Sequence, residues 1–167
     1  MIGDLVMVRR GNGLFDRLVR FATVSPYFHC AIVADRGDLI EARMGGVARR
    51  PVTEYAGRAD ILSPVGATQA QREAAVAFCQ AKLGQPYGYE DILADALRLG
   101  FHIDTAYRWR TWAHMDCSAL VANAWATAGL WLTFEPAPTP ASLGWSPILS
   151  GPRPWAELGA TNLGGNL

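Results

Sequence analysis

The order in which strand-like and helix-like segments occur predicts an α+β fold. Short β-rich runs separated by tight turns fill most of the first third of the chain, and the main helical segments follow from Thr68 onward. Strands joined by short turns pair as an antiparallel sheet, and the helices that follow bury their apolar stripes against that sheet. The length of 167 residues and a hydrophobic fraction of 50% suit a single domain with a sizeable core.

Five strands are expected before residue 65, each a short apolar run bounded by turn-forming residues. Turns are expected at residues 11–13, 35–38 and 45–46, where Gly, Asn and Asp gather. A short amphipathic helix over 14–22 is expected between the first two strands. The expected strands span residues 5–8, 29–34, 39–42, 47–52 and 58–62.

Three helices are expected after residue 67. Thr68 and Gln71 form a T-x-x-Q capping box at the start of the first helix, whose apolar residues recur at helical spacing until Gly84 ends it. The second and third helices are expected over 89–99 and 117–128, and each is followed by a glycine.

The last fifth of the chain has a different composition. Residues 136–167 contain six Pro and five Gly, which predicts an irregular arm that wraps the body. We therefore expect one domain over 1–158, with its arm starting at about 136, and a mobile tail over 159–167.

Charge and cysteine content exclude several classes of protein. The chain has 15 Lys and Arg and 15 Asp and Glu, so it lacks the basic excess of a protein that binds nucleic acid by neutralising phosphates. Three cysteines without a CxxC pair do not form a disulfide framework. No apolar run is long enough for a transmembrane helix, and residues 1–4 lack the features of a signal peptide. Neither a nucleic-acid partner nor a membrane span is expected.

Cys117, His29 and Glu41 are the residues best suited to chemistry. Cys117 is expected at the start of a helix, where free N–H groups and the helix dipole stabilise a thiolate. His29 opens an apolar strand and is the candidate base. Glu41, on the next strand, is expected on the same face as His29, where it would fix the imidazole tautomer as the third member of a triad. Taken singly, the Cys and the His are also typical of core residues.

The remaining cysteines have a structural interpretation. Strand alternation places Cys30 on the opposite face from His29, and Cys79 belongs to the apolar stripe of a helix, so both are expected in the core. A metal site made of His114, Asp116 and Cys117 would match no zinc motif. No metal and no other cofactor is expected.

The segment around Cys117 resembles the nucleophile motif of an enzyme family. Residues 116–121 read D-C-S-A-L-V and are similar to the D-C-S-G-L-V motif of NlpC-type cell-wall peptidases, which are papain-like cysteine hydrolases. Ala119 stands where the family often has Gly or Glu. His29 precedes Cys117, which is the order of the circularly permuted branch of that superfamily. Further segments resemble motifs of that branch in the same order, namely Gly3-Asp4-Leu5-Val6, residues 25–33 around His29, Glu41-Ala42, Gly84-Gln85-Pro86-Tyr87 and Thr139-Pro140-Ala141-Ser142-Leu143.

The resemblance implies a papain-like α+β fold in permuted order, with the helix of the nucleophile packed against an antiparallel sheet. It implies Cys117 as the nucleophile, His29 as the base and Glu41 as the orienting residue, although the third position varies in the superfamily. Tyr87 matches a family tyrosine near the site, and with Ser118 it is expected to contact the oxyanion or the substrate. The alternative for Tyr87 is a loop tyrosine that packs on the core.

An aromatic and basic segment has no counterpart in that family. It lies within residues 101–114 and contains Trp109 and Trp112. These two side chains are expected to line a cleft for a peptide or a glycan. The alternative is that they fill space beside the helices or contact another protein.

The resemblance implies a cysteine peptidase or amidase that cleaves amide bonds in peptidoglycan peptides. Such an enzyme without a signal peptide needs a carrier, and a phage tail that opens the cell wall would supply one. Tail proteins are then the expected partners and the tail tip of the virion the expected location, with the cytoplasm as the alternative. Two other functions stay open: an intracellular thioester-forming amidase or lipid acyltransferase of the same superfamily, and a non-catalytic structural module.

Overall fold

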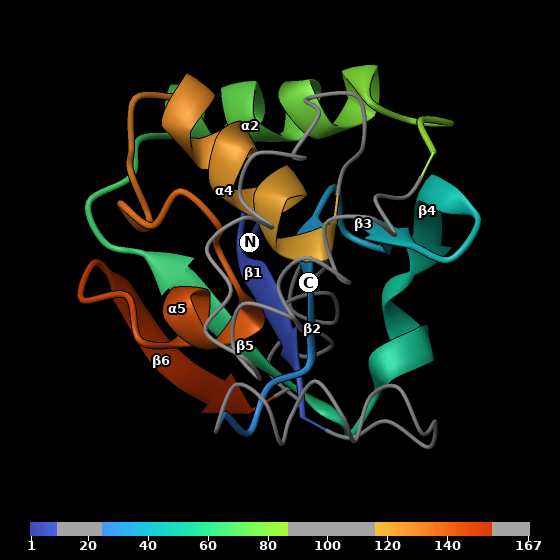
Figure 1. Cartoon of the computed structure of the whole chain (residues 1–167), viewed down its shortest axis with the longest axis horizontal. Helices are drawn as coiled ribbons and strands as arrows, with labels where there is room; N and C mark the ends of the chain where they lie inside the picture. Colours follow the sequence, from blue (N-terminus) through green and yellow to red (C-terminus); the bar gives the residue numbers. More distant parts are fainter. Residues whose placement is uncertain (10–24, 87–115, 155–167) are drawn as a thin grey trace, which may run out of the picture.

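A six-stranded antiparallel sheet forms the body of the molecule, and two helices cover one of its faces (Figure 1). The computed structural model describes residues 1–9, 25–86 and 116–154. The strand order is β4-β3-β2-β1-β5-β6, so the first strand lies in the middle of the sheet. The elements are β1 (Leu5–Val8), β2 (His29–Val33), β3 (Asp38–Arg43), β4 (Gly46–Pro51), the 3₁₀ helix η1 (Val52–Tyr55), β5 (Ala59–Pro64), α2 (Gln69–Ala81), α4 (Cys117–Thr127), α5 (Pro140–Gly144) and β6 (Leu149–Pro154).

The five predicted strands and their antiparallel pairing are confirmed. Their ends differ from the predicted ones by no more than two residues. β1 pairs with β2 on one side and with β5 on the other, and β3 continues the sheet from β2 to β4. The α+β class is therefore confirmed.

The helix predicted from the capping box at Thr68 is also confirmed. The Thr68 hydroxyl accepts a hydrogen bond from the Gln71 N–H at 3.2 Å, and the Gln71 side chain accepts one from the Thr68 N–H at 3.0 Å. The helix expected over 117–128 is α4, which ends one residue earlier. The helices expected over 14–22 and 89–99 and the tail expected over 159–167 lie outside the described residues.

The prediction of an irregular arm from about residue 136 is wrong for two stretches of it. Pro140 occupies the first turn of α5, where a backbone N–H would have no hydrogen-bond partner within the helix, so proline costs nothing there. Thr139 and Ser142 form a capping box at this end of the helix. β6 forms the last strand of the sheet beside β5 despite its prolines, because an edge strand leaves one row of its N–H groups unpaired anyway. A high Pro and Gly content predicts irregular structure, but proline is tolerated in the first turn of a helix and in an edge strand.

Side chains of the central strand alternate between two buried layers. Leu5 and Met7 point into the layer beneath the helices, which also contains residues of α2 and α4. Val6 and Val8 point into the opposite layer, together with residues of β2, β3, η1 and β5. Cys30 lies in the layer beneath the helices and Ala31 in the opposite one, so the predicted placement of Cys30 in the core is confirmed.

A buried ionic cluster around Asp4 joins β1 to α2, β5 and β6. The Asp4 carboxylate accepts hydrogen bonds from the Ser63 hydroxyl at 2.6 Å and from Nη1 of Arg72 at 2.8 Å. Nη2 of Arg153 completes the cluster at 2.8 Å from the other carboxylate oxygen. Asp4 is fully buried and Arg72 is almost fully buried. Each charge is therefore stable in the interior only because opposite charges and hydrogen bonds surround it. The Gly3-Asp4 pair at the start of β1 thus has a structural role.

The segment after α2 returns along the edge strand β4. The Val47 N–H donates to the Gln85 carbonyl at 2.9 Å, and the Gly84 N–H donates to the Val47 carbonyl at 2.8 Å. Gly46 has a φ of +106°, and a Cβ there would lie 2.5 Å from the Gln85 carbonyl oxygen. This close approach holds the segment that precedes Tyr87 against β4.

Candidate active site

Cys117 is the first residue of α4, where a thiolate gains the most from the helix. Asp116 is the N-cap, and its carboxylate accepts the Ala119 N–H at 2.6 Å. The side chain of Cys117 reaches the layer between α4 and the sheet, and the residue is 7% exposed. The sequence prediction that a helix begins at Cys117 is confirmed, and the N-terminal end of the helix dipole favours the anionic sulfur.

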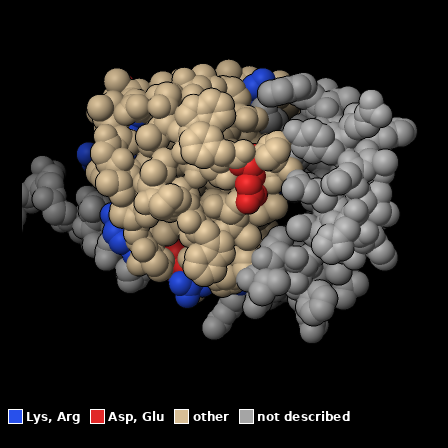
Figure 2. All heavy atoms as spheres, turned by 60° about the vertical axis from the view of Figure 1, so that its left-hand side comes forward, with Lys and Arg blue, Asp and Glu red and all other residues tan. Residues whose placement is uncertain are grey.

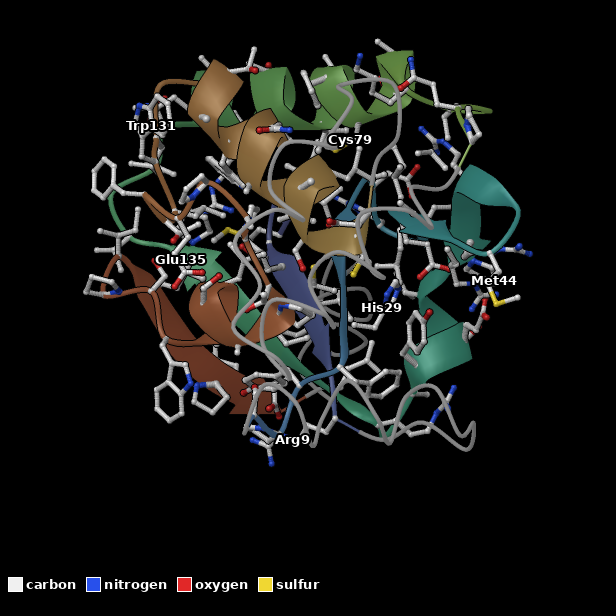
Figure 3. The ribbon with its side chains drawn as sticks, viewed as in Figure 1. Arg9, His29, Met44, Cys79, Trp131 and Glu135 are labelled. Carbon is white, nitrogen blue, oxygen red and sulfur yellow. The ribbon has the colours of Figure 1, made fainter. Side chains whose placement is uncertain are left out.

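His29 and Glu41 lie in direct contact, as their spacing around the β2–β3 turn predicts. Nε2 of His29 lies 2.8 Å from Oε2 of Glu41, and both residues are buried. β2 pairs with β3 through Ile32 and Val33, while His29 pairs with Val8 of β1 at the far end of β2. Figure 3 shows the imidazole close to the start of α4. Because Nε2 is taken by Glu41, Nδ1 is the ring nitrogen left to interact with Cys117.

The electrostatics of the site favour an ion pair between Cys117 and His29. Burial alone would lower the pKa of His29, but the charge and hydrogen bond of Cys117, reinforced by Glu41, raise that pKa to about 10. A hydrogen bond from Cys30 lowers the pKa of Cys117 well below its ordinary value, with the charge of His29 adding to it and outweighing burial. Across the pH range between these two pKa values the site holds a thiolate and an imidazolium.

Glu41 is held in place by two residues that sequence reasoning missed. The Tyr55 hydroxyl donates a hydrogen bond to Oε2 of Glu41 at 2.7 Å, and Nε of Arg43 lies 3.1 Å from Oε1. Burial alone would raise the pKa of Glu41, but the hydrogen bond and charge of His29, followed by Tyr55 and Arg43, lower it overall. Arg43 could have been found from its position two residues after Glu41 on the same strand face. Tyr55 belongs to η1, a short 3₁₀ helix that no pattern in the sequence predicts.

Ser118, a predicted oxyanion or substrate residue, has its hydroxyl between two cysteine sulfurs. Its Oγ lies 3.8 Å from Sγ of Cys117 and 3.9 Å from Sγ of Cys30. The side chain is buried, so the hydroxyl faces the interior of the protein. The other predicted contact residues, Tyr87, Trp109 and Trp112, lie outside the described residues.

Thiol alkylation at mildly acidic pH should label Cys117 first among the three cysteines. Its lowered pKa leaves a thiolate where the other two are protonated. A hydrogen bond to Cys117, together with burial, raises the pKa of Cys30 well above the ordinary value, and burial raises that of Cys79 to about 12. Peptide mass spectrometry after brief iodoacetamide treatment measures the order. Faster labelling of Cys30 or Cys79 would contradict this arrangement.

Glu41→Gln should narrow the pH range in which the thiolate is present. Loss of the carboxylate removes two of the causes that raise the pKa of His29, so that pKa falls. A weaker imidazolium then stabilises the Cys117 thiolate less, and the acidic midpoint of the alkylation rate moves to higher pH. Tyr55→Phe keeps the carboxylate and serves as the matched variant, with a smaller shift. An unchanged midpoint in Glu41→Gln would show that Glu41 does not act on the pair.

Comparison with known proteins bears on the fold. Neither a family model nor a curated protein matches the chain. Among solved structures, the chain is similar to the metalloprotein yiiX from Escherichia coli O157:H7, described as DUF1105, with a TM-score of 0.66 and 15% sequence identity. The likeness covers 90% of this chain and 94% of that chain. At this identity it shows a shared fold, and chemistry has to be argued from the site.

Proposed function

We propose that the chain is a cysteine hydrolase with a papain-like fold in the permuted NlpC-type order, which cleaves amide bonds in peptidoglycan peptides. The observation that carries the proposal is the contact between Nε2 of His29 and Oε2 of Glu41 beside a cysteine at a helix N-terminus. A nucleophile, a base and a group that orients the base are the components of a triad, and a triad is recognised by these roles.

The proposed reaction proceeds through a thioester on Cys117. The thiolate attacks the amide carbonyl carbon, and the backbone N–H of Cys117 is the first donor to the oxyanion. The His29 imidazolium gives its proton to the leaving amine, which departs as the thioester forms. Neutral His29 then takes a proton from water as the water attacks the thioester, and the thiolate is released. Glu41 keeps Nε2 bound throughout, so Nδ1 moves the proton in both steps.

The proposed mechanism uses no metal, and the described residues of the site do not fit one. The similar protein yiiX is described as a metalloprotein. Among the residues that the structure describes, no three His, Cys, Asp or Glu side chains are grouped to hold a metal ion. Nε2 of His29 and Oε2 of Glu41, which would be natural ligands, are bound to each other. His114 of the triple considered in the sequence lies outside the described residues.

A second candidate, an acyltransferase acting on lipid esters, is favoured by exposed aromatic side chains, two of which stack on each other. Trp131, Phe134 and Trp145 are 59%, 86% and 74% exposed, and the rings of Trp131 and Phe134 stack at a centroid distance of 6.1 Å. Trp131 lies on the left of the view in Figure 3, and Figure 2, which brings that side forward, shows few charged side chains there. Exposed tryptophan on a weakly charged face is typical of contact with a membrane interface. The chemistry at Cys117 would be the same thioester formation.

Incubation of the purified chain with peptidoglycan sacculi tests the proposal. Mass spectrometry of the soluble fraction should show fragments that carry a new amine and a new carboxylate at one type of amide bond. The same preparation is given vesicles of a neutral phosphatidylcholine. Cleavage of the lipid ester without any fragment from sacculi, with the acyl group passed from Cys117 to an added amine acceptor, would replace the proposal with the second candidate. If neither product is released and Cys117 does not react with iodoacetamide, the interpretation as a non-catalytic structural module would replace both enzymatic proposals.

A further inference from the structure

Cys30 is a buried nucleophile that the proposed mechanism does not use. It follows His29 directly in β2, and its side chain points into the layer beneath α4, where Cys117 also lies. Cys30 is 0% exposed, so it has no route to a substrate of its own. What it can reach is the first turn of α4.

The geometry brings the sulfurs of Cys30 and Cys117 around one oxygen. The Ser118 hydroxyl lies 3.9 Å from Sγ of Cys30 and 3.8 Å from Sγ of Cys117. The two thiols are also close enough for each to shift the pKa of the other, that of Cys30 upward and that of Cys117 downward. Neither sulfur is in a disulfide in this structure, and Cys79 belongs to a separate helix. The arrangement therefore joins two free thiols in one buried pair.

The charges of the two groups differ in the way that a redox pair requires. Cys117 is the anionic partner, because the hydrogen bond from Cys30 and the charge of His29 outweigh burial and lower its pKa. Cys30 stays a thiol, because its hydrogen bond to Cys117 and its burial raise its pKa. Peroxides oxidise a thiolate and leave a buried thiol untouched. Cys117 would then react first and Cys30 second.

We propose that Cys117 and Cys30 are a peroxide-sensitive pair, in which the oxidised nucleophile is captured by its neighbour as a reversible disulfide. In the first step the Cys117 thiolate attacks one oxygen of hydrogen peroxide, the O–O bond breaks, and a sulfenic acid and hydroxide result. In the second step the sulfur of Cys30 attacks the sulfenic sulfur, an S–S bond forms, and the thiol proton leaves with the hydroxyl group as water. Peroxide is the oxidant, and each cysteine loses one electron overall.

Capture by Cys30 would protect the nucleophile as well as silence it. A sulfenic acid without a neighbouring thiol is oxidised further to sulfinic acid, which ordinary thiol reductants do not reverse. A disulfide is returned to two thiols by exchange with an added dithiol. The inference rests on the proposed function only in that it needs a reactive thiolate at Cys117, and it adds a way to switch that thiolate off.

Peptide mapping after peroxide treatment tests the pair without any hydrolytic assay. The intact chain is exposed to hydrogen peroxide, free thiols are blocked with iodoacetamide, and tryptic peptides are identified by mass spectrometry. We expect a cross-linked peptide that joins Cys30 to Cys117, with Cys79 blocked by the reagent, and we expect dithiothreitol to remove the cross-link. Absence of that peptide, or a cross-link that includes Cys79, would overturn the proposal.

Cys30→Ser supplies the second arm, with Cys79→Ser as the matched control. Peroxide should convert Cys117 of Cys30→Ser to sulfinic acid that dithiothreitol does not reverse, whereas Cys79→Ser should form the same cross-link as the unaltered chain. If dithiothreitol restores the Cys117 thiol of peroxide-treated Cys30→Ser as fully as that of Cys79→Ser, the proposal is also overturned. The mass spectra report on the cysteines themselves and not on turnover. The redox proposal can therefore be refuted while the proposed amide hydrolysis stands, and it can be supported while hydrolysis is not found.

Discussion

Cys117→Ala is expected to abolish amide hydrolysis, with a loss on the order of 10⁴-fold or more. The sulfur of Cys117 forms the acyl bond in the proposed mechanism, and no other described thiol can take its place, because Cys30 and Cys79 are fully buried. His29 and Glu41 remain in contact in the variant but have no nucleophile to serve. The loss should therefore appear in kcat, measured as the rate of fragment release from sacculi.

Cys79→Ala is the matched control for this substitution. Cys79 is buried in α2 and lies in the same core layer, so both variants lose a sulfur from the core. Cys79→Ala should lower the free energy of unfolding by roughly 1 kcal/mol, and both variants should keep the circular dichroism spectrum of the unaltered chain. Cys79→Ala should release fragments at the unaltered rate. Hydrolysis by Cys117→Ala at that same rate would refute the role of Cys117.

Asp4→Asn is expected to lower the free energy of unfolding by about 3–5 kcal/mol. The substitution removes the charge that faces Arg72 at 2.8 Å, and Arg72 has almost no contact with water. Asparagine can still accept one hydrogen bond, but it cannot compensate a buried guanidinium. Urea unfolding followed by tryptophan fluorescence measures the change, since Trp125 is buried in the neighbouring core layer. Asp35→Asn, at an exposed aspartate that pairs with Arg49, should change the same quantity by no more than about 1 kcal/mol.

The same cluster predicts a loss of stability in acid. Burial would raise the pKa of Asp4, but hydrogen bonds from the amino terminus, Ser63 and Arg72 lower it overall. The folded pKa is thus below the unfolded value of about 3.9, and the stabilisation is complete above that pH and lost as the pH falls through the folded pKa. Asp4→Asn lacks this contribution, so its stability should depend less on pH below about 5. Equal pH dependence of the two proteins would contradict this assignment.

Local sequence signals predicted the parts of the site that depend on neighbouring strands. His29 and Glu41 are joined by one tight turn, so antiparallel pairing brings their strands together whatever the rest of the chain does. The residues next to Cys117 predicted that a helix begins there. In the structure Asp116 is the N-cap residue of that helix. In each case the structure follows from contacts within a few residues or across one turn.

The parts that sequence reasoning missed depend on long-range packing. Tyr55 reaches Glu41 because η1 returns beneath β3 after β4, and no periodic pattern marks a single 3₁₀ turn. The position of Ser118 between two sulfurs depends on how α4 crosses β2. β6 was missed because its prolines argue against a strand, and only the edge of a finished sheet makes them acceptable.

The central claim is that Cys117 is a thiolate paired with the His29 imidazolium, and a thiolate titration tests it most directly. The ultraviolet absorbance of Cys117→Ala is subtracted from that of the unaltered chain at each pH, so that only the signal of Cys117 remains. The arrangement predicts a thiolate that persists well below the ordinary thiol pKa of about 8.5, and a midpoint that moves up toward that value in His29→Gln. A midpoint at or above about 8.5 in the unaltered chain would contradict the claim.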